Sequence, residues 1–346
     1  MSIGECETLS IHRPMKDHLA LATLLVVVLT TPATAQISCG DTLGPGGKFV
    51  AAGPIGPCPQ NPALTILGPV KVDFAGHEVS CDATSSNGIN IEGKSATVEN
   101  GAVARCNVGF HVQGEGKHKL TRLVARNNAG DGFVLEGGGG NKLKECASVF
   151  NEACGFVIES SDKNALTGCR SVRNLDTGFF FDAANGNKVK DCTSAEDFEE
   201  GFRILGQGNK LTNVDATQSG SHGFEVNGNG NTLKDVTATG SMSTGFVISE
   251  GAGIKLSKCA SVANGQRGIL VGSLADGTKV SKCRTIKNGA EGITVDSGAG
   301  DVSIDKNVAF HNVLDDLEDA NAGCGTNTWK KNTFGTSNPA APGCIE

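Results

Sequence analysis

The chain has 346 residues, 48 of them Gly, with one Trp, no Tyr and a formal net charge of −7. Apolar residues make up 38% and charged residues 19%, which excludes a disordered polyelectrolyte, and the acidic charge argues against a nucleic-acid partner. Gly is about twice as frequent as in average proteins, which favours many tight turns and few helices.

The N-terminal segment has the features of an export signal. An apolar run over residues 19–29 follows Met15 and precedes the sequence A-T-A at residues 33–35. The run is shorter than the about 20 residues of a membrane span, and the A-x-A pattern is typical of signal-peptidase cleavage. We therefore predict a signal peptide over residues 1–35, with residues 1–14 as an upstream extension; the alternative is a buried helix. No second apolar run follows, so we expect no membrane span after cleavage and a secreted or periplasmic protein.

A repeat follows a short N-terminal cap. Residues 36–65 are rich in Gly and Pro, and we expect them to cover the end of the repeat region. Beyond them, Gly followed by Phe or Ile recurs at spacings of 21–24 residues. Ten copies with a period near 23 indicate a solenoid of stacked units. The repeated glycines are Gly88, Gly109, Gly132, Gly155, Gly178, Gly201, Gly223, Gly245, Gly268 and Gly292.

Each repeat contains short segments with strand character. The glycine is followed by an apolar-x-apolar pattern, as in Phe133-Val134-Leu135, which sends alternate side chains to one face. The Gly and Asn residues between these segments leave no room for a helix of about 10 residues. We therefore predict an all-β fold, a single-stranded parallel β-helix of about 11 coils over residues 66–320.

Equivalent positions of successive coils should form ladders. The Phe residues directly after the glycine predict an internal aromatic stack. A polar residue four positions before the glycine, most often Asn, predicts a hydrogen-bonded column at a corner. The aromatic positions are Phe110, Phe133, Phe156, Phe179, Phe202, Phe224 and Phe246, and the polar column is Asn128, Asn151, Asn174, Asp197, Ser219, Ser241, Asn264 and Asn288.

The clearest unit, from Gly140 to Ile158, reads G-N-K-L-K-E-C-A-S-V-x-N-x-x-x-G-F-V-I. It resembles the bacterial right-handed parallel β-helix repeat proteins of the pectin-lyase-like superfamily, and the resemblance covers about residues 66–315. The resemblance implies a right-handed coil, in line with the general preference of parallel crossovers. Lyases, hydrolases, epimerases and inert spikes share this fold, so the resemblance leaves the function open.

The C-terminal segment, residues 321–346, is predicted to close the other end. It contains Trp329 and Phe334, which would seal the last coil, and it resembles the closing segment of secreted bacterial β-helix proteins. An open end would expose strand edges that pair with other chains. The acidic run over residues 315–319 is predicted to end the coiling by its charge.

Twelve of the 13 cysteines follow the predicted cleavage site. Six lie toward the two ends of the repeat region and are predicted to form disulfides, which export would permit. Five share one internal column and are interpreted as buried free thiols, with bridges between adjacent coils as the alternative. Cys154 has no predicted partner, and no C-x-x-C pair supports a zinc site. The predicted bridges are Cys39–Cys58, Cys81–Cys106 and Cys324–Cys344, and the internal column is Cys146, Cys169, Cys192, Cys259 and Cys283.

Acidic residues recur at an outward position four residues after the glycine. Glu136, Glu159 and Asp182 occupy it in consecutive coils, where like charges repel. One interpretation is a metal site for Ca²⁺, which prefers several carboxylate oxygens. The other is a solvated edge that keeps copies apart, and on that interpretation the protein requires no cofactor.

A second candidate site lies in the middle coils, one coil from Asp182. Arg203 and Glu225 share the second position after the glycine, and Glu200 and His222 share the position directly before it. An Arg beside carboxylates stabilises an enolate while a base removes a proton, as β-elimination from a uronate requires. The alternative is a surface ion-pair network of little energetic weight.

These observations leave two functions. The first is a non-catalytic extracellular or envelope rod with a structural or binding role, favoured by the absence of long insertions, of Tyr and of a second Trp. The second is a carbohydrate-active lyase, hydrolase or epimerase acting on an acidic polysaccharide. The chain contains neither the D-P-H-D motif of alginate epimerases nor the W-x-D-H motif of pectate lyases. The second function implies a polysaccharide partner, whereas the first leaves open whether the surface of the rod binds a polysaccharide.

Overall fold

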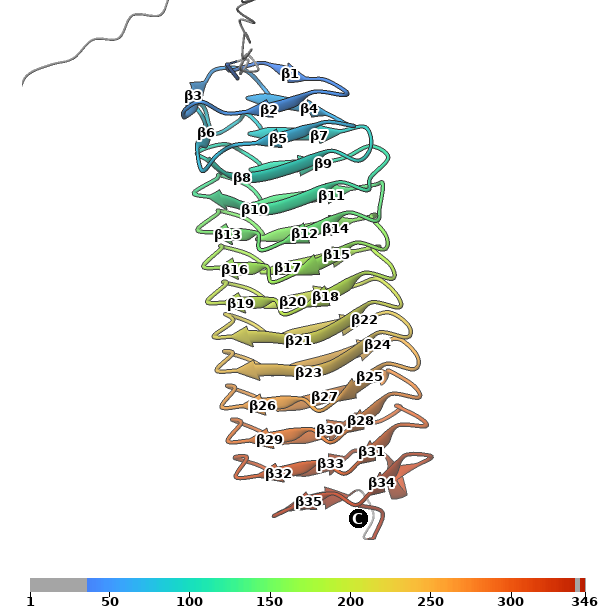
Figure 1. The fold of residues 1–346 in the computed structure, drawn as a ribbon. Helices are drawn as coiled ribbons and strands as arrows, with labels where there is room; N and C mark the ends of the chain where they lie inside the picture. Colours follow the sequence, from blue (N-terminus) through green and yellow to red (C-terminus); the bar gives the residue numbers. More distant parts are fainter. Residues whose placement is uncertain (1–35, 340–342, 346) are drawn as a thin grey trace, which may run out of the picture. The chain divides into compact units, whose positions relative to one another are not determined.

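The chain forms a stack of short parallel strands that coil around one continuous core (Figure 1). The computed structural model describes residues 36–339 and 343–345, so the predicted signal peptide over residues 1–35 lies outside the described residues. Strands of neighbouring turns pair in parallel and in register, with Phe133 opposite Phe156 and Leu143 opposite Leu166. The predicted all-β parallel β-helix is confirmed.

Sheet A carries the aromatic ladder and has 14 strands, which follow one another in chain order. Its side chains alternate between core and solvent: in Phe156–Glu159 the side chains of Phe156 and Ile158 are buried, and Val157 faces outward. The strands are β1 (Thr42–Leu43), β4 (Leu64–Leu67), β7 (Ile89–Glu92), β9 (Phe110–Val112), β11 (Phe133–Glu136), β14 (Phe156–Glu159), β17 (Phe179–Asp182), β20 (Phe202–Ile204), β22 (Phe224–Asn227), β24 (Phe246–Glu250), β27 (Ile269–Leu274), β30 (Ile293–Val295), β33 (Leu317–Asp319) and β36 (Ser337–Pro339).

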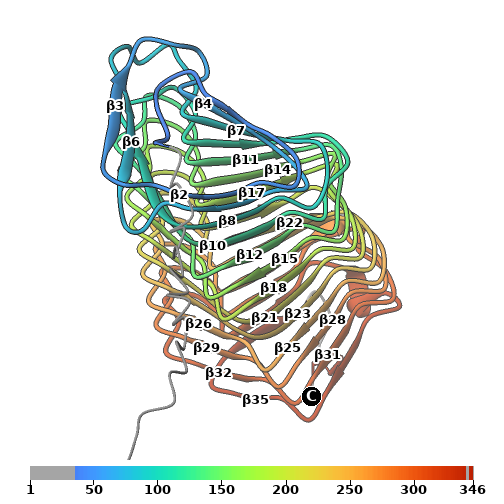
Figure 2. The ribbon, with the colours of Figure 1, turned by 45° about the horizontal axis from the view of Figure 1, so that its top comes forward.

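Sheet B comprises the rest of each turn and has two strand positions separated by a bend. Some turns have one long strand through the bend, and the others have two short strands (Figure 2). A residue at the bend has left-handed backbone angles, as at Arg122 (φ 51°) and Glu145 (φ 56°).

The long strands of sheet B are β8 (Thr97–Ala104), β10 (Lys119–Arg126), β21 (Lys210–Thr217) and β23 (Thr232–Thr239). The short pairs are β2 (Lys48–Val50) and β3 (Ile55–Cys58), β5 (Lys71–Asp73) and β6 (Glu78–Cys81), β12 (Lys142–Lys144) and β13 (Ala147–Val149), β15 (Ala165–Thr167) and β16 (Arg170–Val172), β18 (Lys188–Lys190) and β19 (Thr193–Ala195), β25 (Lys255–Ser257) and β26 (Ala260–Val262), β28 (Lys279–Ser281) and β29 (Arg284–Ile286), β31 (Ser303–Asp305) and β32 (Val308–Phe310), and β34 (Thr328–Lys330) and β35 (Thr333–Phe334).

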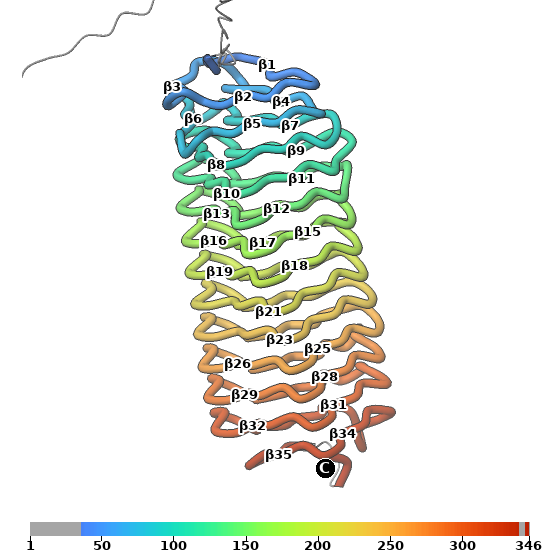
Figure 3. The backbone as a smooth tube through the Cα atoms, in the orientation of Figure 1, coloured from blue at the N-terminus to red at the C-terminus, as the bar shows by residue number. Residues whose placement is uncertain are grey.

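The connections between strands are short throughout residues 36–339, and the turns follow one another evenly (Figure 3). Residues 82–88 and 296–302 form connections of seven residues each, and residues 320–327 include the single-turn helix η1 (Ala322–Cys324). Within the described part of the chain, no helix is long and apolar enough to cross a membrane. The outer face of sheet A is therefore not covered by a long loop.

The coil has about 13 turns rather than the predicted 11. β1 and β2 pair with β4 and β5, and β34, β35 and β36 pair with β31, β32 and β33. These end turns lack the Gly-Phe or Gly-Ile marker that defined the repeat. The acidic run does not end the coiling, because Leu317 continues the ladder opposite Ile293. Residues 36–65 and 321–346 thus contribute strands to the sheets, and their function as caps stays a prediction.

The aromatic ladder fills the core behind sheet A. Neighbouring rings from Phe110 to Phe246 stack with centroids 4.7–5.0 Å apart and planes within 2–8°. The glycine before each ring allows this close approach of turns. A Cβ atom on Gly201 would lie 2.7 Å from the carbonyl oxygen of Gly223, which is too close for a real Cβ, so a larger residue would push the turns apart.

Two polar columns satisfy the buried backbone at the corners. In the predicted column, Asn151 Oδ1 accepts the backbone N–H of Asn128 at 3.0 Å and its side-chain amide at 2.8 Å, and this pattern continues to Asp197. Sequence analysis missed a second column, in which each side-chain oxygen accepts a backbone N–H of the previous turn at 2.7–2.9 Å. Its signal was the Asn that precedes the Lys-apolar pair in several repeats. The second column is Asn141, Asn164, Asn187, Asn209 and Asn231.

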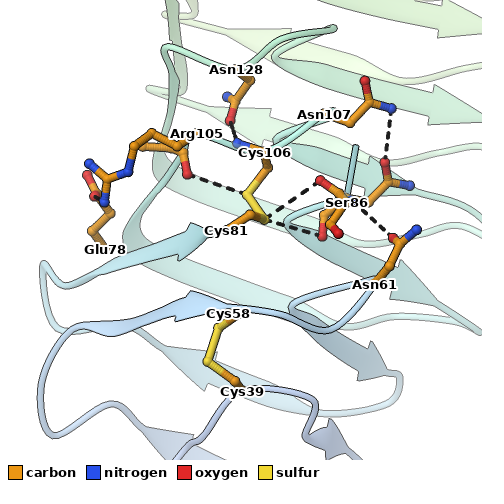
Figure 4. The surroundings of a disulfide bond; sticks show 12 residues. Cys39, Cys58, Asn61, Glu78, Cys81, Ser86, Arg105, Cys106, Asn107 and Asn128 are labelled. Carbon is orange, nitrogen blue, oxygen red and sulfur yellow. Dashed lines mark hydrogen bonds and ion pairs between the residues drawn. A yellow bond between two sulfur atoms is a disulfide. The ribbon is translucent and has the colours of Figure 1, made fainter. Parts of the chain in front are cut away.

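The described cysteines form four disulfides. The three predicted bridges are present, and Figure 4 shows two of them, with the Asn128 side chain accepting the backbone N–H of Cys106 at 3.1 Å. The interpretation of the whole internal column as free thiols is wrong at Cys259 and Cys283, which form the fourth bridge with Cα atoms 4.4 Å apart. Stacking of turns places paired Cα atoms within the range that a disulfide spans. The other bridges are Cys39–Cys58, Cys81–Cys106 and Cys324–Cys344, and the buried free thiols are Cys146, Cys154, Cys169 and Cys192.

Candidate functional site

Arg203 and Glu225 meet on the outer face of sheet A. They stand opposite each other on β20 and β22, and Arg203 Nε lies 3.1 Å from Glu225 Oε2. The direction of this contact makes it an ion pair rather than a hydrogen bond. The guanidinium carbon also lies 5.5 Å from the centre of the Phe180 ring on β17. The Arg203 side chain is 42% exposed, so the pair is partly solvated.

The carboxylate of Glu225 is engaged at both oxygens. Oε2 faces Arg203, and Oε1 accepts a hydrogen bond from the side-chain amide of Asn227 at 3.1 Å. A general base needs a free lone pair directed at the proton that it removes. Arg203 and Glu225 neutralise each other in this arrangement, and substrate would have to displace one of these partners first.

Glu200 and His222 lie at the corner just before sheet A begins. Glu200 is buried and accepts a hydrogen bond from Thr177 Oγ1 at 3.1 Å. His222 Nδ1 accepts the backbone N–H of Thr244 at 3.3 Å. Among the described residues, no hydrogen bond or ion pair joins Glu200 or His222 to the Arg203–Glu225 pair. The structure thus places the four residues in two adjacent turns but brings only Arg203 and Glu225 into contact.

The acidic column is aligned as its spacing predicts. Glu136, Glu159 and Asp182 stand opposite one another on β11, β14 and β17. Glu136 Oε2 lies 2.8 Å from Nε2 of His111 on the preceding turn, which gives this carboxylate a protein partner. In the part of the chain that the structure describes, no group of three or more His, Cys, Asp or Glu side chains is arranged to hold a metal ion. The assignment of Ca²⁺ to this column stays a prediction.

Sequence analysis missed a second charged group farther along sheet A. Arg267 and Glu291 continue the column of Glu200 and His222, and Arg267 Nε donates to Glu291 Oε2 at 2.8 Å. Burial, and then the negative charge of Glu291, raise the pKa of Glu318 on β33. Reading the position before each glycine beyond Gly245 would have identified Arg267 and Glu291.

The family comparison matches most of the repeat region. The model described as a right handed beta helix region matches residues 87–209 and 178–338. No curated protein matches the sequence.

Several solved structures superpose on this chain at low sequence identity. The periplasmic alginate epimerase AlgG superposes with a TM-score of 0.54 at 13% identity, over 84% of this chain and 78% of that chain. PfbA, a surface adhesin of Streptococcus pneumoniae, has a TM-score of 0.46 at 8% identity, over 79% of this chain and 83% of that chain. At these identities the similarity to AlgG establishes the fold alone.

Proposed function

Because the chain belongs to the right-handed β-helix family, we propose that it is a non-catalytic rod of the cell envelope or extracellular space that binds a polymer on its surface. The observation that carries this proposal is the shortness of every connection between strands within residues 36–339. Catalytic clefts on rigid scaffolds are commonly built from loops. With connections this short, a polymer would lie along a broad open face of the coil.

Export is part of the proposal. The apolar run and the A-x-A pattern before residue 36 support a cleaved signal peptide. Four disulfides support an oxidising compartment, since structural disulfides rarely persist in the cytosol. We infer a secreted or periplasmic protein that begins at Gln36 after cleavage.

A carbohydrate-active enzyme that acts on an acidic polysaccharide is the second candidate function. Two observations favour it: the fold shared with an alginate epimerase, and the contact of Arg203 with Glu225 on the face of sheet A. In such an enzyme Arg203 would stabilise the enolate formed at a uronate carboxyl group, and His222 or Glu200 would exchange the proton at the neighbouring carbon. Ca²⁺ at Glu136, Glu159 and Asp182 would neutralise substrate carboxylates.

One experiment separates the two functions. Residues 36–346 are incubated with a panel of uronate polysaccharides, with and without Ca²⁺. Unsaturated product is followed by absorbance, chain cleavage by reducing ends, and epimerisation by the exchange of carbon-bound hydrogen for deuterium. If the protein is a non-catalytic rod, none of the three assays gives a signal, and at least one polymer binds measurably.

Arg173 offers a matched control for the enzyme hypothesis. Like Arg203 it pairs with a carboxylate, Glu196 at 2.7 Å, and lies over a phenylalanine ring, Phe150 at 5.7 Å. If activity is lost in Arg203→Ala and kept in Arg173→Ala, with both variants folded, the enzyme hypothesis is supported and the hypothesis of a non-catalytic rod is refuted.

A further inference from the structure

A column of lysines runs along the outer face of sheet B. At the first position of its first strand, the residues of successive turns read Lys, Lys, Thr, Lys, Lys, Ala, Lys, Lys, Thr, Lys, Lys, Ser and Thr. Two lysines in adjacent turns are thus followed by one small residue, and the pattern occurs four times. The lysine column consists of Lys48, Lys71, Lys119, Lys142, Lys188, Lys210, Lys255 and Lys279.

Most of these lysines have no acidic partner. All eight side chains are exposed, and among the described residues only Lys71 forms an ion pair, with Glu99 at 2.8 Å. Other lysines of sheet B differ, since Lys144 and Lys190 each pair with the acidic residue that follows them in the chain. Like charges directly opposite each other on neighbouring strands are unfavourable. The column therefore maintains unneutralised positive charge in a chain whose net charge is negative.

Shallow hollows lie on the same face, two of them at small residues between the lysine pairs and one at a lysine pair. One of about 400 Å³ lies around Thr97 and is lined by Lys117, Lys119 and Lys142. A second, of about 280 Å³, lies at Ala165, and a third, of about 320 Å³, is lined by Lys188, Lys190 and Lys210. Such volumes lie near the lower end of the roughly 300–1,000 Å³ range of small-ligand sites.

We propose that the lysine column binds an extended anionic polysaccharide that lies along the axis of the coil, with its carboxylate or sulfate groups on the lysine pairs and its sugar rings over the hollows. The proposal rests on the proposed function and names its ligand class and its surface. Neighbouring turns are close, with their stacked Phe rings 4.7–5.0 Å apart, so each lysine pair places two cations on adjacent strands, and a ligand with regularly spaced negative charges matches such a row.

Two other partners fit less well. Single-stranded nucleic acid is bound on aromatic side chains that stack with bases, and the outward positions of the strands that carry the column hold no aromatic residue in the described chain. A second copy of the protein could offer the carboxylates of sheet A as counter-charges, so self-association is an outcome of the test below. There Glu136, Glu225 and Glu291 are already engaged by His111, Arg203 and Arg267.

The test compares two fourfold variants of residues 36–346 that lose the same charge. The first carries Lys119→Gln, Lys142→Gln, Lys188→Gln and Lys210→Gln. The control carries Lys258→Gln, Lys282→Gln, Lys306→Gln and Lys331→Gln. These four lysines lie at the bend of sheet B, outside the lysine column. Binding of polygalacturonate is titrated at several salt concentrations, with dextran, single-stranded DNA and phosphatidylserine vesicles as comparison probes. Circular dichroism verifies the fold of both variants.

The lysine column predicts at least a tenfold loss of polygalacturonate affinity in the first variant, with a smaller salt dependence, because fewer counterions are released. The control should stay within about twofold of the wild type. An equal loss in both variants, DNA or vesicle binding as tight as that of polygalacturonate, or salt-reversible self-association in place of binding would overturn the proposal. If the first variant binds polygalacturonate as tightly as the wild type, the lysine column is refuted as the binding surface, and the proposed function is not. If the wild type binds no polymer, dextran included, the proposed function itself is refuted.

Discussion

Asp197 occupies a position of the first polar column that is Asn in most other turns. Its Oδ1 accepts the backbone and side-chain N–H groups of Asn174 at 2.9 Å each, and its Oδ2 accepts the hydroxyl of Ser194 at 2.7 Å. The side chain is buried. Burial raises the pKa of the Asp197 carboxyl, and these hydrogen bonds offset part of the rise.

The Asp197→Asn variant should remove a pH dependence of stability. Because the folded pKa of Asp197 lies above the unfolded value of about 3.9, the folded state binds its proton more tightly. Stability contributed by this group is present below pH 4 and is lost as pH rises through the folded pKa. Melting temperatures of both proteins between pH 3 and pH 8 test this expectation. Wild type should lose stability relative to the variant across that window, and parallel curves would contradict the assignment.

The cysteines allow a direct count. Denatured, unreduced protein of residues 36–346 should take up four alkyl groups, on Cys146, Cys154, Cys169 and Cys192. In the folded protein at pH 8 these thiols should react slowly because all four are buried; at Cys154, burial and the nearby charge of Asp176 also raise the pKa, and reaction requires the thiolate. Mass spectrometry of the alkylated protein gives the number. Uptake of six groups would mean that Cys259 and Cys283 are free.

At the scale of the strand, inward and outward side chains should differ sharply in energetic weight. Phe179 and Phe180 are neighbours on β17, the first inside the aromatic ladder and the second beneath Arg203 on the outer face. Phe179→Ala should lower the free energy of unfolding by about 3–5 kcal/mol, since it leaves a cavity between two stacked rings. Phe180→Ala should cost about 1 kcal/mol, from lost packing and cation–π contact.

Urea unfolding followed by circular dichroism measures both values. The two substitutions remove the same atoms from adjacent residues, so each serves as the control for the other. Equal effects would mean that the outer face of sheet A is covered in solution.

The strands that share the repeat marker could be predicted, because a Gly-Phe pair fixes the register of the residues around it. The period therefore identified the aromatic ladder, the first polar column and the opposition of Arg203 and Glu225. It could not show that Glu200 bonds to Thr177 or that His222 receives the N–H of Thr244, because the direction of a side chain at a corner depends on the bend. The second polar column escaped because its Asn positions lie outside the alternating strand pattern.

At the scale of the whole coil, the two terminal turns differ in sequence from the repeats between them. The terminal turns were missed because Leu64 and Leu317 hold the ladder position without a preceding Gly-Phe marker. At the C-terminal end, Trp329 is buried and its Nε1 donates to Asp319 Oδ2 at 2.8 Å. This contact joins the last segment to β33.

We expect a protein that is monomeric in solution to associate when residues 321–346 are removed, because the removal exposes the edges of β31, β32 and β33, which now pair with β34, β35 and β36. Size-exclusion chromatography with light scattering tests this expectation. A Cys324→Ala/Cys344→Ala variant, which lacks the bridge but keeps the strands, serves as the control and should remain monomeric. A truncated protein that stays monomeric would refute the capping function of this segment.

The equal register of the turns has a consequence for how such a gene can change. Since each ring of the ladder meets an identical ring 4.7–5.0 Å away, duplication of a stretch of about 23 codons inserts a turn whose neighbours meet the same residues as before. Length is then inherited in whole turns, whereas the gain or loss of a few codons inside a turn would shift every column at once. Descendants of this chain should accordingly differ in the number of turns far more readily than in the size of each one.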